Sequence, residues 1–568
     1  MGKNDDILIN STTKNQDNGT INKDNQRRGF ITSVGTFGVA GLSAATLSST
    51  LIPNYALAEQ HSNNVIENIE SLKLVTPSFD GEIFFLLGHT IKGIGGGFWY
   101  YDISDNTSED DGFRVIKTES DARIKRVDLS TLTLDQCGCI PHYADNQFDN
   151  SEVLNRIFND NVIHSLIIPD NSEYRFESDI RILRDNLTIS GAGPRSNLQG
   201  RGLAKIILGQ ANSSGIKTEG AKVININFNN IGIKPQGDRS VEAVLLDYAD
   251  DIKFNNCNIG SYSNDTGSNF ETGVVCRWVQ WVYFNETIID VNGHCVEIKL
   301  ENTEQRNEDH FHFTNCRLYN SKTPAGGKTP AAIAVVRETG NNYSIFEFSM
   351  KGCHFGAFGL NINGTSGLKL VNEPSESTVR TFHAATISGC FFENVDFPLD
   401  FIREAPTRDD VRVSIDGTSF LNGNTVFYGG NINAHRVNLN NVSVTQFDTY
   451  ANNVRCHFIM GNNIINVKNP FPNGIPRHRF ASKTSNTSLQ GYRLAFSGQV
   501  VVEANTNQVT VTHNLSSAPS IFTVSPLNSA WIAPYAITDI NDETFKIRFN
   551  DRPTQQRSLR WSAEVQEI

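Results

Sequence analysis

The stretch that decides the fold reads VININFNNIGI at residues 223–233, DIKFNNCNI at 251–259, WVYFNETII at 281–289 and HFHFTNCRL at 310–318. Each copy alternates apolar with polar residues and then has Asn or Gly, a small or apolar residue, a spacer and another apolar residue. Five more copies follow: SMKGCHF (349–355), TISGCFF (386–392), SIDGTSF (414–420), LNNVSV (439–444) and IMGNNII (459–465). Successive copies lie 21 to 37 residues apart. A fixed unit with variable spacing is typical of stacked repeats that carry loop insertions.

The alternation predicts strands in which every second side chain points inward. After each strand comes an Asn or Gly, the residues that best tolerate positive φ, so the chain can bend sharply there. These bend residues are Asn230, Asn256, Asn285, Asn315, Gly352, Gly389, Gly417, Asn441 and Asn462. Apolar spacing near three and four, which a helical repeat needs, is absent. The unit therefore predicts a parallel β-helix.

The residue after each bend is expected to point inward, and Cys occupies this position four times. Counting in the same way puts Glu286 there, where a buried carboxylate is costly unless it is paired. Either the register slips by one residue at YFNETII, or Glu286 is hydrogen-bonded inside. The slipped register is favoured.

Residues 1–58 are predicted to be a targeting segment. Arg27 and Arg28 precede a mildly apolar run rich in Gly, Ala and Ser, and the run ends at Ala56-Leu57-Ala58. This pattern resembles a twin-arginine export signal, which implies a periplasmic or secreted protein. The alternative is a disordered arm followed by a short membrane anchor. No membrane contact is expected once the signal is removed.

Charge and cysteine usage restrict the class further. The formal net charge of −12 argues against a general nucleic-acid binder. The nine Cys residues are odd in number, and four share one interior column, which does not suggest a disulfide framework. Buried free thiols suit a protein that folds in a reducing cytoplasm before export.

Residues 72–130 show short alternating segments around Gly-rich turns and are predicted to form a small β head. They include GEIFFLLGHTIKGIGGGFWYYDISD, and LTLDQCGCIP and DNSEVLNRIF follow. This series resembles the front end of bacteriophage tailspikes of the pectate-lyase superfamily. The resemblance implies a head, then a capping helix, then a β-helix, and it also implies a homotrimer. We therefore predict an all-β chain: a right-handed parallel β-helix with an N-terminal β head and a C-terminal β-sandwich.

The domain limits follow from these patterns. Residues 131–466 are assigned to the capping helix and the β-helix, because Asp149-Asn150-Ser151 precede an apolar helical pattern before the first rungs. Residues 467–490 are rich in Pro, Asn and Ser and are predicted to be a linker. Residues 491–568 resume as alternating segments, which indicate a small β-sandwich.

The substrate groove is placed on the strand that begins each rung, such as AVLLDY, CVEIKL, LNING and PLDFIRE. If Val244 and Leu246, Val296 and Ile298, and Leu399 and Phe401 point inward, alternation turns charged residues outward. We predict Asp247, Glu297 and Arg277 as catalytic, and Lys299, Arg337 and Asp400 as substrate-binding. Asp247 and Glu297 are expected to be exposed, with Arg277 on the rung between them. The alternative is an ordinary solvated ladder of charges.

Two classes of function remain. One is a polysaccharide-degrading enzyme, either a glycosidase with two carboxylates or a lyase whose Lys or Arg base removes a proton beside a uronate. The other is a non-catalytic glycan-binding or surface-attachment protein on the same scaffold. No metal motif is recognised, no cofactor is predicted, and His294, His310 and His312 are interpreted as structural or surface residues.

Overall fold

The computed structural model describes residues 64–565 except for 171, 193–203, 209–214, 219, 221, 236–238, 261–268, 302–309, 321–328, 338–344, 358–363, 373–381, 402–411, 430–434, 453–455, 461–463, 470–479, 483–494, 514, 516–517 and 528–532. The segment predicted to be an export signal, residues 1–58, lies outside this part of the chain. Among the described residues, no helix is long and apolar enough to cross a membrane.

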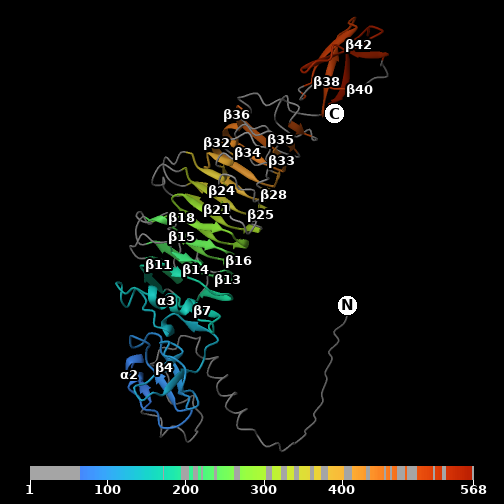
Figure 1. Cartoon of the computed structure of the whole chain (residues 1–568). Helices are drawn as coiled ribbons and strands as arrows, with labels where there is room; N and C mark the ends of the chain where they lie inside the picture. Colours follow the sequence, from blue (N-terminus) through green and yellow to red (C-terminus); the bar gives the residue numbers. More distant parts are fainter. Residues whose placement is uncertain are drawn as a thin grey trace, which may run out of the picture. The chain divides into compact units, whose positions relative to one another are not determined.

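The N-terminal unit is a five-stranded sheet with one short helix, drawn in blue in Figure 1. Its elements are β1 (Val65–Ile66), α2 (Ile69–Lys73), β2 (Ile83–Leu86), β3 (Gly97–Tyr101), β4 (Val115–Lys117) and β5 (Arg123–Arg126). The strand order is β1-β2-β3-β5-β4. Trp99 is fully buried at its centre, and the Arg126 guanidinium lies 4.4 Å from the Trp99 ring centroid. This unit is the predicted β head.

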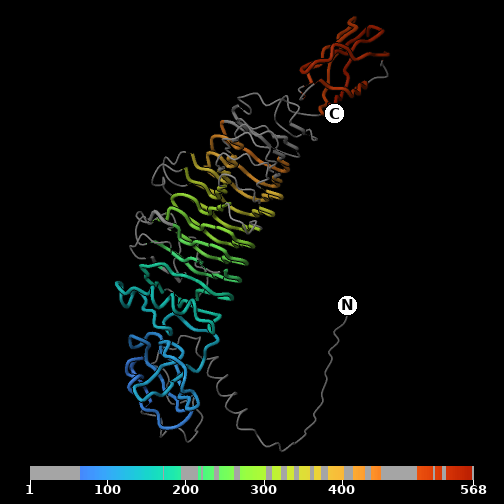
Figure 2. Tube along the Cα trace, viewed as in Figure 1, coloured from blue at the N-terminus to red at the C-terminus, as the bar shows by residue number. Residues whose placement is uncertain are grey.

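The second unit contains a parallel β-helix, whose rungs run from green to orange in Figures 1 and 2. A rung has three strands, as in β13 (Val223–Asn229), β14 (Ile231–Pro235) and β15 (Arg239–Asp247). First strands pair with first strands in a 13-stranded sheet, and second and third strands belong to a 19-stranded sheet. The predicted parallel β-helix is confirmed.

First strands are β6 (Leu132–Thr133), β7 (Ser165–Ile168), β10 (Leu187–Gly191), β13, β16 (Ala249–Asn255), β19 (Gln280–Asn285), β22 (His310–Thr314), β25 (Ile345–Lys351), β28 (Phe382–Ser388), β31 (Arg412–Asp416), β33 (His435–Asn440), β35 (Cys456–Met460) and β37 (Phe480–Ser482). Second strands are β8 (Glu173–Phe176), β11 (Ala204–Leu208), β14, β17 (Asn258–Gly260), β20 (Ile288–Val291), β23 (Arg317–Asn320), β26 (His354–Ala357) and β29 (Phe391–Glu393). Third strands are β9 (Ile180–Arg181), β12 (Ile216–Lys217), β15, β18 (Phe270–Arg277), β21 (His294–Leu300), β24 (Ala331–Arg337), β27 (Ser366–Asn372) and β30 (Phe397–Phe401). The later strands β32 (Ser419–Gly429), β34 (Ser443–Asn452) and β36 (Ile464–Asn469) continue this sheet.

Within the described residues, which do not include the predicted bend at Asn462, the bends lie where the Asn/Gly pattern predicts them, with one exception. Positive φ values of 50 to 62° occur at Asn230, Asn256, Glu286, Asn315, Gly352, Gly389, Gly417 and Asn441. Glu286 therefore holds the bend in its rung, and Thr287, which is fully buried, takes the inward position. The slipped register is confirmed, and Asn285 is not a bend residue.

Asn285 instead belongs to a row of amides just before the bends. Its Nδ2 donates to Asn255 Oδ1 at 2.8 Å, and Asn255 Nδ2 donates to Asn229 Oδ1 at 2.9 Å. The interior behind this row is equally regular. Phe228, Phe254, Phe284 and Phe313 stack with ring centroids 4.8 to 5.0 Å apart. Repetition of one side chain on successive rungs thus stabilises both the inside and the outside of the bend.

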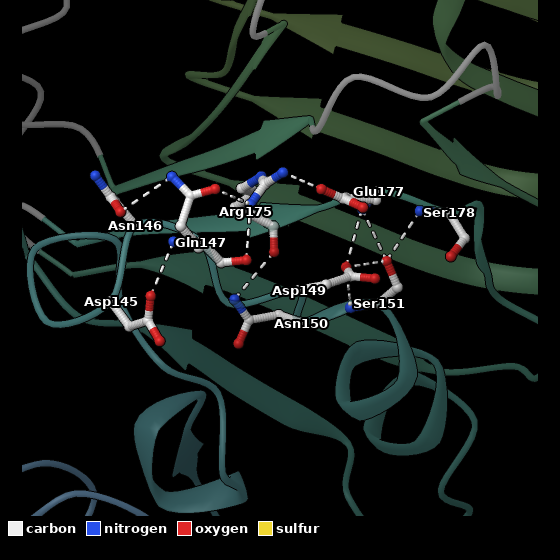
Figure 3. Close-up of polar contacts among 9 residues, drawn as sticks. All are labelled: Asp145, Asn146, Gln147, Asp149, Asn150, Ser151, Arg175, Glu177 and Ser178. Atoms are coloured by element: carbon white, nitrogen blue, oxygen red, sulfur yellow. Dashed lines mark hydrogen bonds and ion pairs between the residues drawn. The ribbon is translucent and has the colours of Figure 1, made fainter.

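The predicted capping helix is α3 (Ser151–Phe158), which buries Leu154, Ile157 and Phe158. Its N-terminus is bound to β8, as Figure 3 shows. Asp149 Oδ1 accepts from Ser151 N at 3.0 Å, from Ser151 Oγ at 2.5 Å and from Glu177 N at 3.0 Å. The amide of fully buried Asn150 donates to the Arg175 carbonyl and exchanges hydrogen bonds with the Ile140 backbone. The polar run before the helix therefore orders the start of the β-helix.

The C-terminal module has two three-stranded antiparallel sheets, with strand orders β38-β43-β40 and β39-β42-β41. The strands are β38 (Ala495–Val502), β39 (Gln508–Thr512), β40 (Ile521–Pro526), β41 (Tyr535–Thr538), β42 (Thr544–Phe549) and β43 (Arg557–Glu564). Trp561 lies in the core that the two sheets share. This agrees with the predicted β-sandwich. Two strands, β36 and β37, occupy part of the segment predicted as a linker and pair with earlier β-helix strands.

Candidate functional site

The third strands face inward and outward as the alternation predicts. Val244, Leu246, Val296, Ile298, Leu399 and Phe401 are all at most 1% exposed. The residues between them on β15, β21 and β30 are therefore on the outer face of the β-helix. This is the face on which we predicted the substrate groove.

Asp247 and Arg277 form the centre of the predicted site. They are cross-strand partners on β15 and β18, and Arg277 Nη2 lies 2.8 Å from Asp247 Oδ2. The next residues, Tyr248 and Trp278, have φ values of 58° and 51°, so the chain turns sharply directly after the ion pair. Asp247 is only 8% exposed, and the expectation of an exposed carboxylate is wrong. The ion pair and the turn together hold this carboxylate against the corner of the rung.

Glu297 is displaced from the row in which we placed it. Arg277 pairs with Lys299 on β21, whereas Glu297 pairs with Val275. Glu297 is therefore two residues out of line with Asp247, and two strand steps of ~4.8 Å with two residues of ~3.3 Å put their backbones roughly 12 Å apart. Lys299 Nζ lies 3.6 Å from Glu297 Oε1. Arg277 is on the rung between the two carboxylates, as predicted, but it is in line with Asp247 and Lys299 and not with Glu297.

Arg337 does not belong to the outer face. It pairs with Leu300, an interior residue, and is 1% exposed. Burial lowers the pKa of the Arg337 guanidinium to about 10. Its expected place on the groove is wrong, because Arg337 alternates in phase with the buried Ile333 and Val335, and the residue in line with Lys299 is Val336.

Asp400 is on the expected face but is 2% exposed. Ser366 Oγ donates to Asp400 Oδ2 at 2.7 Å, and the cross-strand partner of Asp400 is Lys369 on β27. Burial lowers the pKa of Lys369, against the opposing effect of the Asp400 charge. The sequence reasoning missed Lys369 because it took LNING at 360–364 as the strand of this rung. The alternating SGLKLVN that follows was the available signal.

The outer face of the third strands thus carries charges of both signs on five of the six rungs from β15 to β30, whereas β24 has Ala334 and Val336 at these positions. Asp247, Arg277, Lys299 and Glu297 lie on its first three rungs, and Lys369 and Asp400 lie on its last two. We call these six residues the charged ribbon. Such a ribbon can bind hydroxyl and carboxylate groups of a saccharide, but its ion pairs do not form the two facing carboxylates of a glycosidase. Among the described residues no cluster of three or more His, Cys, Asp or Glu could hold a metal ion.

Comparison with known proteins identifies the class of fold to which this chain is similar. The profile of the family described as the phage tail protein small four-stranded beta-sheet domain matches residues 65–129, the head. Together with the parallel β-helix, this match defines a tailspike-like fold. No curated protein sequence matches the chain.

Among solved structures, the chain is similar to the tailspike gp49 of Pseudomonas phage LKA1, with 10% identity, TM-score 0.42, and 77% of this chain and 100% of that chain covered. It is also similar to the tailspike of Acinetobacter phage vB_ApiP_P1, with 11% identity, TM-score 0.40 and coverage of 89% and 98%. A third is WceF of Pantoea stewartii, a glycan biofilm modifying enzyme with a tailspike-like parallel β-helix, with 12% identity, TM-score 0.32 and coverage of 89% and 74%.

Proposed function

We propose that this chain is an exported, polysaccharide-degrading protein whose glycan lies along the outer face of the third strands. The charged ribbon is the observation that carries the proposal. Asp247 and Arg277 are cross-strand partners of opposite charge, and Lys369 and Asp400 repeat this arrangement farther along the same face. A periodic row of donors and acceptors suits a polymer with repeating polar groups.

Elimination is favoured over hydrolysis as the reaction. A glycosidase needs two carboxyl groups about 5–9.5 Å apart, and the register separates Asp247 from Glu297. Asp247 is instead ion-paired with Arg277, whose Nη2 lies 2.8 Å from Asp247 Oδ2. A lyase needs cationic groups beside an acidic sugar, and the ribbon supplies three: Arg277, Lys299 and Lys369.

The first experiment is incubation of the purified chain with a panel of capsular and uronate-containing polysaccharides. Reducing ends report any cleavage, and the ultraviolet absorbance of unsaturated sugars reports elimination alone. We expect both signals to rise with at least one acidic polysaccharide. Glycan binding without either signal would instead support the alternative, a non-catalytic glycan-binding protein.

The roles of Asp247, Glu297 and Arg277 are tested on the substrate so found. If these residues are catalytic, Asp247→Asn, Glu297→Gln and Arg277→Gln lower kcat; if they only bind the glycan, they raise KM and leave kcat. Lys253→Gln is the matched control, because Lys253 is on a first strand, in the other sheet. Thermal unfolding of each variant separates loss of function from loss of fold, which matters most for the buried Asp247.

A further inference from the structure

Three polar side chains on consecutive second strands are joined by hydrogen bonds, and we call them the relay. Tyr319 on β23 is bonded through its hydroxyl to His354 Nδ1 on β26 at 3.1 Å. His354 Nε2 in turn lies 3.2 Å from Glu393 Oε2 on β29. The rings of Tyr319 and His354 meet edge to face, with centroids 5.4 Å apart. None of the three belongs to the charged ribbon.

The register of the β-helix explains how they meet. Tyr319, Gly356 and Glu393 are successive cross-strand partners, and His354 is two residues before Gly356. Leu318, Phe355 and Phe392 are fully buried, so the residues that alternate with them are on the outer face. Because Gly356 has no side chain, His354 can lean into the space between Tyr319 and Glu393.

The protonation state of His354, the middle member of the relay, follows from its surroundings. Burial lowers the pKa of His354, Arg317 also lowers it, and Glu393 opposes both. His354 is therefore neutral at neutral pH. A neutral imidazole that faces a carboxylate with Nε2 donates its proton there, and its Nδ1 accepts from the Tyr319 hydroxyl. Buried Asp290, the cross-strand partner of Tyr319 on β20, also faces this row, as does Arg317, the partner of His354.

The relay has a buried end, Tyr319, and a solvent-exposed end, Glu393. Tyr319 is 2% exposed, whereas the side chains of His354 and Glu393 are 28% and 31% exposed. A glycan can thus reach His354 and Glu393 but not Tyr319, and the hydrogen bonds of Tyr319 and His354 fix the orientation of the Glu393 carboxylate. Residues 394–396 alone join β29 to β30, where Asp400 pairs with Lys369, so Glu393 is one short turn from the charged ribbon.

We propose that Glu393 is the proton-transferring catalytic residue of this protein, that His354 and Tyr319 are positioning residues, and that Arg317 binds the carboxylate of an acidic sugar. Arg317 is the cross-strand partner of His354, so its cation lies beside the relay. The proposal rests on the proposed polysaccharide-degrading function and names its substrate class, a glycan that contains uronate.

The proposed reaction is an elimination that needs no co-reactant. Glu393 removes the proton from the carbon next to the sugar carboxylate, whose negative charge Arg317 offsets. The electron pair of that C–H bond becomes the new carbon–carbon double bond. The neighbouring glycosidic C–O bond breaks with its pair on oxygen, and the proton passes from Glu393 to this oxygen. The carboxylate returns to its starting state.

The test uses the full chain with the acidic polysaccharide that the panel identifies. Glu393→Gln is expected to lower kcat by about 10²- to 10⁴-fold with KM little changed. Glu347→Gln is the matched control, because Glu347 pairs with His310 at 3.8 Å on the first-strand sheet, and it should keep the wild-type rate. Thermal unfolding should be similar for both variants.

The positioning residues are tested by comparing kcat with KM and by rescue with a conservative variant. His354→Phe removes the N–H that orients the Glu393 carboxylate, so kcat should fall with KM little changed. His354→Gln, whose amide can donate to the same oxygen, should restore part of kcat. Tyr319→Phe should lower kcat by a smaller factor.

The outcomes separate the two proposals. If the wild-type chain cleaves no acidic polysaccharide, the proposed function fails and this inference fails with it. If the wild-type chain cleaves and Glu393→Gln cleaves equally fast, only the inference is wrong. Loss of kcat in Asp247→Asn but not in Glu393→Gln would place the chemistry on the charged ribbon.

Discussion

Single residues at the bends decide how accurately the rungs stack. Glu286 has a φ of 50°, in a row where the other described bends are occupied by Asn or Gly. A long side chain in the left-handed region costs ~1 kcal/mol or more relative to Gly or Asn. The β-helix accepts this cost because Asn285 and Thr287 on either side keep the amide row and the interior regular.

Replacing Glu286 by Asn should therefore stabilise the chain. We expect Glu286→Asn to raise the free energy of unfolding by ~0.5–1 kcal/mol, since Asn adopts positive φ more readily. Urea unfolding followed by circular dichroism measures the change. Asn285→Ala is the contrasting variant, because it removes a ladder hydrogen bond and should cost ~1 kcal/mol. A loss of stability in Glu286→Asn would contradict our account of this bend.

At the scale of elements, one carboxylate joins the start of α3 to the end of β8. Asp149 Oδ1 accepts three hydrogen bonds, two from Ser151 and one from Glu177 N on the segment after β8 (Figure 3). Ser151 Oγ accepts from the backbone of Glu177 and Ser178, both at 2.9 Å. The helix start and the end of β8 are thus one hydrogen-bonded structure.

Asp149→Ala should destabilise the start of the β-helix by ~1.5–3 kcal/mol, the usual range for loss of hydrogen bonds to a charged group. Hydrogen exchange of residues 151–158 and 173–181 is expected to increase together, because the same carboxylate orders both segments. Asp145→Ala serves as the control, since Asp145 accepts from Gln147 N in an exposed turn. Equal exchange in both variants would show that the Asp149 carboxylate is dispensable.

At the scale of the whole molecule, assembly and export remain predictions. The resemblance to tailspikes implies a parallel homotrimer in which the C-terminal sandwich holds the three chains together. Light scattering on residues 59–568 should give a mass of three chains, and deletion of residues 491–568 should lower it. A monomer that persists at high concentration would contradict this prediction.

Export is tested by producing the full-length protein in its native host cells. Changing Arg27 and Arg28 together to Lys should retain the protein in the cytoplasm, because the twin-arginine pathway reads this pair. Fractionation followed by immunoblotting measures the location. Lys14→Arg, a change in the preceding polar arm, should leave export unchanged. Mature protein outside the cytoplasm in the Lys–Lys variant would rule out this route.

The sequence alone determined the architecture. Alternation places Phe228, Phe254 and Phe284 inside, and a residue that tolerates positive φ follows each first strand; both signals are local. They predict the strands, the bends and the register slip at Glu286. The inward residues Val244, Val296 and Leu399 were predictable for the same reason.

Only the tertiary structure decided which outward residues meet. Loops of unequal length separate the strands, so the register of Glu297 against Asp247, and of Lys299 against Val336, depends on pairing that local pattern does not contain. Tyr319 and Glu393 lie 35 and 39 residues from His354, and they meet there only because three rungs stack with Gly356 between them. Period-two alternation specifies the face of a strand, whereas hydrogen bonding between distant strands specifies the neighbours on that face.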